Sequence, residues 1–300
     1  MPRLRPVLAR LAVLALVTLA ACGDGNDVAS GTGPSDGADV PETLRFGIGP
    51  YQPTADDTKA AFEPFFAYLA EQLGAEYELD VTTDFAGIAV ALANGQVDLA
   101  WMGPYGYVLA NNDSGAQAIA TVKYDGEPTY HSIVVAAPDS PVTDWPTDAR
   151  GMSISFTEVA STSGWLIPTH FLAEQGIDPK TYFQYSEGAA HPANETAVAN
   201  GQVELATDYD RNRTAMIEAG AIGPDATKVV WESEPLPNDA IAVREGLDPE
   251  LAQRIQDILV AITPEQAEAF MAEHYTGFVP ADNESYRIIR EAAEDLGQLS

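Results

Sequence analysis

The chain has 300 residues, 46% of them hydrophobic, which is long enough for two domains that each bury a core. Its 45 Asp and Glu residues against 15 Lys and Arg give a formal net charge of −30. That charge argues against nucleic acid as a partner and against binding to an anionic membrane surface by charge. The single cysteine excludes an intrachain disulfide.

The first 21 residues are predicted to be a signal peptide. Three arginines precede the apolar run Leu11–Leu19, which is too short to predict a membrane span. The only cysteine, Cys22, follows Leu19-Ala20-Ala21 directly, and this arrangement resembles the bacterial lipobox, whose cysteine is lipidated and becomes the mature N-terminus. An ordinary signal peptide with an unrelated cysteine is the alternative. We expect Cys22 to be lipidated.

Residues 22–42 are predicted to carry the lipid and to form a flexible tether. The stretch after the cysteine is rich in Gly, Asp, Ser and Pro, a composition typical of linkers. We therefore expect an extracytoplasmic protein that a lipid holds to the cell membrane.

From residue 43 the pattern alternates strands and helices, which is typical of an α/β fold. The first helix, predicted at 56–73, has one stripe of large apolar residues and ends at Gly74. The last part of the chain is predicted to form three helices, the middle one capped by Thr263 with Pro264 at its first position. The other predicted elements are strands at 44–48, 78–81, 97–101, 130–137, 152–156, 203–207, 228–231 and 241–244, and helices at 87–93 and after Ser163.

A ten-residue segment occurs twice. ALANGQVDLA at 91–100 returns as AVANGQVELA at 197–206, identical at eight of ten positions. Each copy predicts a helix end, an Asn-Gly turn and an entering strand. Two copies about a hundred residues apart predict two α/β lobes of similar plan.

The predicted lobe 1 comprises residues 43–128 plus 238–300, and the predicted lobe 2 comprises residues 129–237. Two crossing strands join them, with the return crossing expected at 241–244. This leaves a cleft between the lobes, where small ligands usually bind and which a hinge motion can close.

Three consecutive hydroxyls, Ser161, Thr162 and Ser163, stand before a predicted helix. The unpaired N–H groups and the dipole of a helix N-terminus favour an anion, and hydroxyls add donors without adding charge. The alternative is that one hydroxyl only caps the helix, which leaves the other two unexplained. The cluster predicts an anion site.

The order and spacing of these elements resemble the phosphate-, phosphite- and phosphonate-binding proteins of ABC transporters over nearly all of residues 43–285. The resemblance implies the two-lobed type II periplasmic-binding-protein fold, a small phosphorus oxyanion as ligand, permease and ATPase subunits as partners, and a monomer. The matching stretches are RFGIGPYQP (45–53), TDFAGI (83–88), NGQVDLAWMGPYGYVLA (94–110), STSGWLIP (161–168), AHPANETAVANGQVELAT (190–207) and VVWESEPLPNDAIAVR (229–244).

The resemblance also implies roles for individual residues. Ser161, Thr162 and Ser163 match the hydroxyls that hold the phosphonate oxygens. His191 matches a ligand-contacting histidine. Asp239 matches a carboxylate that accepts a hydrogen bond from a protonated P–OH group.

The sequence departs from the family pattern at positions of the expected site. Phe85 stands where the family often has a tyrosine that donates to the ligand. Met102 stands where aminophosphonate binders place another tyrosine, with Tyr105 and Tyr107 close by in the sequence.

Arg211 aligns with a glutamate that binds the ammonium group in aminoethylphosphonate binders. A guanidinium there would repel an ammonium and could grip an oxyanion oxygen. The resemblance therefore implies phosphate, phosphite or an acidic phosphonate. A slip of one or two residues in the alignment would place Asp208 or Asp210 there instead.

Other functions stay open at this point. The same fold could bind another small oxyanion or an organic acid. A secreted hydrolase using Ser161, His191 and Asp239 is a more distant alternative, because the G-x-S-x-G elbow is missing. We expect no enzyme and no cofactor. We also expect no metal site, because the four histidines have no paired spacing.

Overall fold

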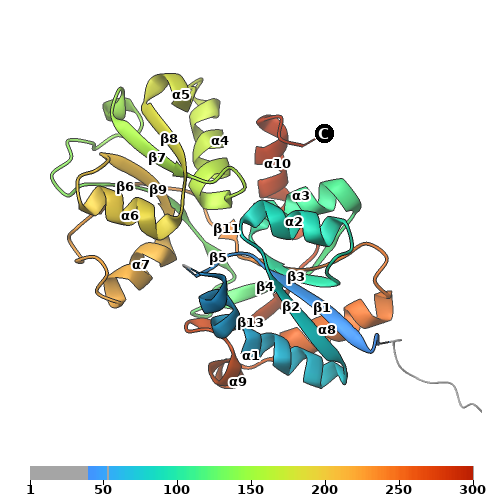
Figure 1. Cartoon of the computed structure of the whole chain (residues 1–300). Coiled ribbons are helices and arrows are strands. Elements are labelled where there is room, and N and C mark those ends of the chain that lie inside the picture. Colours follow the sequence, from blue (N-terminus) through green and yellow to red (C-terminus); the bar gives the residue numbers. More distant parts are fainter. Residues whose placement is uncertain (1–39, 53, 300) are drawn as a thin grey trace, which may run out of the picture. The chain divides into compact units, whose positions relative to one another are not determined.

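The computed structural model describes residues 40–52 and 54–299, which are drawn in colour in Figure 1. The predicted signal peptide at 1–21, the lipidation site Cys22 and the tether up to residue 39 lie outside the described residues. None of the helices in the described ranges combines the length and the apolar character that a membrane crossing requires.

Six strands form one mixed sheet in the order β13-β4-β12-β3-β1-β2 (Figure 1). Strand β1 runs parallel to β2 and β3, whereas β12 runs antiparallel to β3 and β4. The sheet takes its strands from two separate stretches of the chain. Their bounds are β1 Thr43–Ile48, β2 Glu76–Val81, β3 Leu99–Met102, β4 Gln117–Tyr124, β12 Ala240–Val243 and β13 Tyr275–Pro280.

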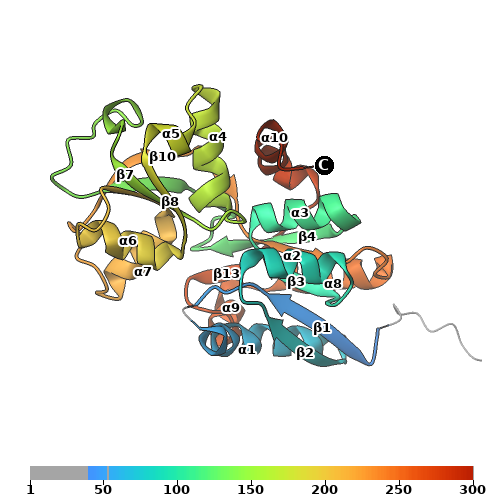
Figure 2. The same cartoon turned by 45° about the horizontal axis from the view of Figure 1, so that its top comes forward.

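Helices cover both faces of this sheet (Figure 2). Strand β3 shows why, because its side chains alternate between the faces: Leu99 and Trp101 pack in the core under α1 and α8, whereas Ala100 and Met102 pack under α2 and α3. We call this sheet with its helices lobe 1. The helices are α1 Ala55–Leu73, α8 Pro249–Ala261 and α9 Pro264–Phe270 on one face, and α2 Phe85–Ala93, α3 Pro104–Ser114 and α10 Arg287–Asp295 on the other.

Five strands form a second sheet in the order β10-β6-β9-β7-β8, which with its helices we call lobe 2. Its strand β6 is buried on both faces: Val134 packs on the side of α4 and Val135 on the side of α6. A short π-helical segment, Thr162–Leu166, runs directly into α4. The bounds are β6 Ser132–Ala136, β7 Ser153–Thr157, β8 Gln184–Ala189, β9 Leu205–Tyr209, β10 Lys228–Glu232, α4 Ile167–Glu174, α5 Pro179–Tyr182, α6 His191–Ala199 and α7 Asp210–Glu218, with 3-10 turns at Thr147–Ala149 in lobe 2 and Glu284–Tyr286 in lobe 1.

Two short strands, β5 (Thr129–Tyr130) and β11 (Leu236–Pro237), pair antiparallel and carry the chain between the sheets (Figure 1). The predicted return crossing at 241–244 is therefore wrong. Those residues belong to β12, which lies between β3 and β4 inside the six-stranded sheet because its four apolar side chains are buried on both faces.

The two copies of the repeat form the same local structure, one in each lobe. A helix ends, the glycine adopts the left-handed region (φ 65° at Gly95 and 67° at Gly201), and a strand follows. The acidic residue of each copy then accepts a backbone N–H from the neighbouring strand: Asp98 from Arg45 at 3.0 Å, and Glu204 from Ser153 at 2.7 Å. The prediction of two α/β lobes of similar plan is confirmed.

Candidate functional site

The three nominated hydroxyls lie where β7 has ended and the helix of lobe 2 begins, and all three residues are buried. Ser161 is the N-cap, and its Oγ accepts the N–H of Gly164 at 3.1 Å. Thr162 Oγ1 accepts the N–H of Tyr105 from lobe 1 at 2.9 Å. Capping therefore explains Ser161 but not Thr162 or Ser163.

Gly164 allows this helix start to approach strand β7. A Cβ at this position would lie 1.9 Å from Thr157 Oγ1 and 2.7 Å from Thr157 Cβ, closer than atoms can pack. Only glycine fits without a shift of the backbone. The close contact fixes the position of the hydroxyl cluster against the sheet.

His191, the first residue of α6, lies against the hydroxyl cluster. Its Nε2 is 3.1 Å from Ser161 Oγ, and its Nδ1 is 2.8 Å from Asp208 Oδ1. Burial lowers the pKa of His191 to about 4, against the opposing charge of Glu158. The carboxyl group at His191 is thus Asp208 and not Asp239, so the arrangement of Ser161, His191 and Asp239 considered for a hydrolase is not the one that forms.

Asp239 directly precedes β12 and accepts the Trp101 Nε1–H at 3.0 Å. Burial raises the pKa of Asp239 to about 6, against the hydrogen bond from Trp101 and the positive charge of Arg211. The hydroxyl of Tyr51 is buried without a hydrogen bond to any described residue. Burial first, and then the charge of Asp239, raise the pKa of Tyr51, so this phenol remains a neutral donor beside the carboxylate.

Arg211, in the first turn of α7, links lobe 2 to the connecting strand and to lobe 1. Its Nη2 donates to the Thr129 carbonyl, and its guanidinium lies 4.4 Å from the ring centroid of Tyr124 on β4. Of the two aspartates near it in sequence, Asp208 turns to His191, and Asp210 accepts the Arg211 backbone N–H at 2.9 Å.

The side chains of the three remaining predicted site residues, Phe85, Met102 and Tyr105, mainly pack against other residues. Phe85 contacts the ring of Tyr51 edge-on at 5.4 Å, and its N–H donates to Glu158 of lobe 2 at 3.1 Å. Met102 is wholly buried in the core and supplies no polar donor. Tyr105 is buried, and the hydrogen bond it makes to the hydroxyl cluster comes from its backbone.

Sequence reasoning missed several polar groups that surround the nominated residues: Tyr51, Trp101, Glu158 and Asp208 in this role. Tyr51 and Trp101 do fall within stretches that carry the family resemblance, which was the one available signal. The roles of Glu158 and Asp208 follow only from contacts between distant parts of the chain.

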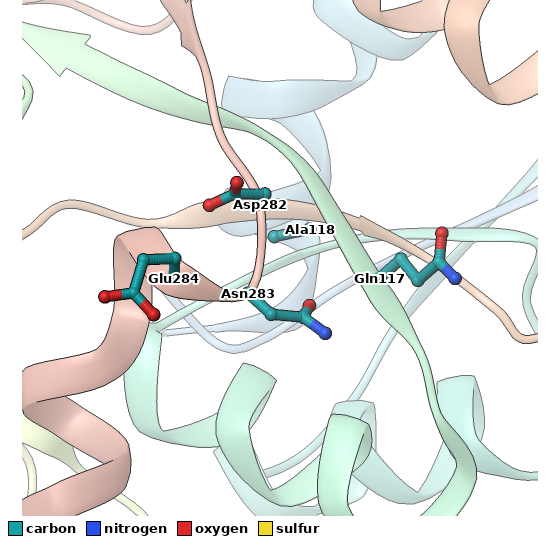
Figure 3. Close-up of a pocket in the computed structure, with 5 residues that line it drawn as sticks. All are labelled: Gln117, Ala118, Asp282, Asn283 and Glu284. Carbon is teal, nitrogen blue, oxygen red and sulfur yellow. The ribbon is translucent and has the colours of Figure 1, made fainter.

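Two surface hollows lie elsewhere. One of about 240 Å³ is lined by Gln117, Ala118, Asp282, Asn283 and Glu284, with two carboxylates at its rim (Figure 3). These charges disfavour an oxyanion. The other, of about 370 Å³, includes the Arg45 side chain, but that guanidinium already binds Asp98 at 2.7 Å. Neither hollow is lined by a site residue that the sequence predicted.

Comparisons with known proteins agree with this fold. Residues 46–286 match the family described as "ABC transporter, phosphonate, periplasmic substrate-binding protein". The phosphate-import protein PhnD of Mycolicibacterium smegmatis is 27% identical over 280 residues, which cover 86% of this chain and 87% of that protein. The phosphonates-binding periplasmic protein of Escherichia coli is 28% identical over 239 residues, 78% of this chain and 70% of that one.

Among solved structures, the binding protein component of an ABC phosphonate transporter from Pseudomonas aeruginosa superposes with a TM-score of 0.73 at 25% identity, covering 85% of this chain and 86% of that one. The predicted two-lobed α/β fold of type II periplasmic binding proteins is thereby confirmed. This chain belongs to the phosphonate family of periplasmic substrate-binding proteins of ABC transporters.

Proposed function

We propose that this chain captures a small phosphorus oxyanion, namely phosphate, phosphite or a phosphonate, for the permease and ATPase subunits of an ABC importer. The observation that carries the proposal is the buried cluster Ser161, Thr162 and Ser163 at a helix start. Hydroxyls and free N–H groups bind an anion by donating hydrogen bonds. The chain needs such local donors, because its negative net charge repels an anion at long range.

Asp239 supports a ligand that still carries a proton. A pKa of about 6 leaves this buried carboxyl group largely ionised at pH 7, where it repels a fully ionised anion and accepts a hydrogen bond from a P–OH group. The two curated relatives, one named for phosphate import and one for phosphonates, support the same ligand class.

Titration calorimetry on the purified protein tests this function. We expect saturable binding of at least one of phosphate, phosphite and methylphosphonate. The variant Ser163→Ala should bind about 10–100-fold more weakly, since a hydrogen bond to a charged group contributes about 1.5–3 kcal/mol. Thr169→Val is the matched control on α4, because the buried Thr169 hydroxyl has no partner among the described residues. Binding of sulfate or a small carboxylate alone would refute the proposal.

Arg211 supports a ligand without an ammonium group, because a fixed guanidinium repels a second cation. We expect Arg211→Glu to weaken phosphate binding and to strengthen 2-aminoethylphosphonate binding. Arg211→Lys keeps the charge and controls for the contacts of the guanidinium with Thr129 and Tyr124. If 2-aminoethylphosphonate is already the best ligand of the wild-type protein, this role of Arg211 is wrong.

The proposal includes a lipid anchor at Cys22, based on the Leu-Ala-Ala-Cys sequence and the linker composition that follows it. Cys22→Ser should move the protein from the membrane fraction to the soluble fraction. Ser30→Ala in the tether is the control. Retention of the cysteine-free protein in the membrane fraction would contradict lipidation.

Hydrolysis is a second candidate because Ser161, His191 and Asp208 form a continuous chain of contacts. A catalytic triad needs a basic imidazole and an ionised aspartate that stabilises the imidazolium. Here burial lowers the pKa of His191 to about 4 and raises the pKa of Asp208 to about 7, and both changes oppose that role. We therefore propose binding without catalysis; turnover of a phosphate ester that Ser161→Ala abolishes would favour the enzyme.

A further inference from the structure

The Ser161 hydroxyl has one proton to donate, and two acceptors compete for it: His191 Nε2 and the bound anion. Its Oγ already accepts the Gly164 N–H at 3.1 Å and lies 3.1 Å from His191 Nε2. If Nε2 carries no proton, Ser161 must donate its own proton to it. Ser161 then presents only lone pairs to an anion. If Nε2 carries a proton, it donates to Ser161 and leaves the hydroxyl proton free for the ligand.

Asp208 determines which of these arrangements exists. It is wholly buried at the end of β9, with Oδ1 2.8 Å from His191 Nδ1 and Oδ2 accepting the Asn212 Nδ2–H at 2.8 Å. An ionised Asp208 accepts a hydrogen bond from Nδ1–H, which leaves Nε2 without a proton in a neutral imidazole. A protonated Asp208 donates from Oδ1 to Nδ1, which puts the imidazole proton on Nε2.

A doubly protonated imidazole would also free the Ser161 hydroxyl. Burial disfavours it, because the pKa of His191 falls to about 4. Between pH 5 and 9 the imidazole is therefore neutral, and its tautomer follows the proton on Asp208.

Burial favours the protonated form of Asp208, against the hydrogen bond from Asn212. Glu195 on α6 is wholly buried, and neither of its carboxyl oxygens makes a hydrogen bond to a described residue. Burial, and then the charge of Asp208, raise the pKa of Glu195 to about 8, while burial raises the pKa of Asp208 to about 7. The other charged or titratable groups that act on this cluster are Glu158 on His191, Asp210 and Tyr209 on Asp208, and Arg213 on Glu195.

We propose that Asp208, acting through His191, is a positioning residue that frees the Ser161 hydroxyl for the ligand by holding a proton, so that anion capture is coupled to protonation of Asp208. The inference rests on the proposed function. It predicts that binding takes up a proton above neutral pH. Affinity should then fall by up to about tenfold per pH unit above pH 7, as one linked proton requires.

Asp208→Asn tests the coupling, because its amide N–H can donate to His191 Nδ1 and its oxygen can accept from Asn212, as in the protonated acid. Phosphate affinity is measured by calorimetry at pH 6, 7.5 and 9, in buffers of different ionisation enthalpy that report proton uptake. Titration of phosphate and of Asp239 occurs in both proteins and cancels in the comparison. We expect the ratio of Kd at pH 9 to Kd at pH 6 to be at least tenfold smaller in Asp208→Asn, with less proton uptake. An equal ratio in both proteins overturns the inference.

A second measurement does not depend on the ligand. Nitrogen-15 NMR of the imidazole, assigned with His191→Gln, should show the Nε2–H tautomer at pH 6 and the Nδ1–H tautomer at pH 9 in the wild-type protein. Asp208→Asn should keep Nε2–H at both. One unchanged tautomer in the wild-type protein overturns this inference whether or not phosphate binds. A tautomer switch without binding of phosphate, phosphite or methylphosphonate refutes only the proposed function.

Discussion

Replacing Glu195 with glutamine is expected to stabilise the protein, and by more at higher pH. Burial raises the pKa of Glu195 from 4.5 to about 8, so the folded state holds a proton that the unfolded state releases. The contribution of a group with a raised pKa is present below the unfolded value and is lost as pH rises through the folded value. Wild-type stability therefore declines between about pH 4.5 and pH 8, by about 1.4 kcal/mol per pH unit for one proton.

Glutamine has the same shape and no charge to desolvate. The free energy of unfolding of Glu195→Gln should match that of the wild-type protein near pH 4.5 and exceed it by about 3–5 kcal/mol at pH 8. Urea unfolding followed by tryptophan fluorescence at pH 5, 6.5 and 8 measures the difference. Glu268→Gln, an exposed position on α9, is the control and should follow the wild-type curve at every pH. A Glu195→Gln effect that is the same at all three pH values would refute the reasoning.

Three further changes test individual contacts. Gly164→Ala should lower the free energy of unfolding by about 1–3 kcal/mol, because its Cβ would overlap the Thr157 side chain of β7. Gly223→Ala, with open space around it, should change the free energy of unfolding by less than about 0.5 kcal/mol in the same urea assay. Asp98→Asn should lower the thermal midpoint by several degrees, because the carboxylate binds two arginine side chains and a backbone N–H. Trp101→Phe should weaken phosphate binding in calorimetry and raise the pKa of Asp239, since the carboxylate loses its donor.

The elements that the sequence predicted well are those with local signals. The repeat predicted two helix–turn–strand units because Asn-Gly is typical of a left-handed turn. Thr263 with Pro264 predicted the start of α9, where the structure has a full capping box. Strands β4 and β13 and helix α3 were missed. The misplacement of the return crossing has a physical cause: the apolar run of β12 looks the same in a connection as in a central strand, and only its pairing partners tell them apart.

The candidate site divides in the same way. The hydroxyl cluster could be found because its three members are contiguous and precede a helix. The hydrogen-bond donor to Asp239 could not be found from the sequence. It is Trp101, which lies 138 residues earlier in the chain and contacts Asp239 only because β3 pairs with β12. Likewise, nothing in the local sequence of Asp208 shows that its carboxyl group contacts His191.

A crystal structure of the protein with bound phosphate tests the central claim most directly. The phosphorus atom should lie among the Ser161, Thr162 and Ser163 hydroxyls, the N–H groups of the following helix and the Asp239 carboxyl group, with a protonated ligand oxygen donating to Asp239. Phosphate bound only in the hollow beside Asp282 and Glu284, or only at the surface of either lobe, would contradict the account.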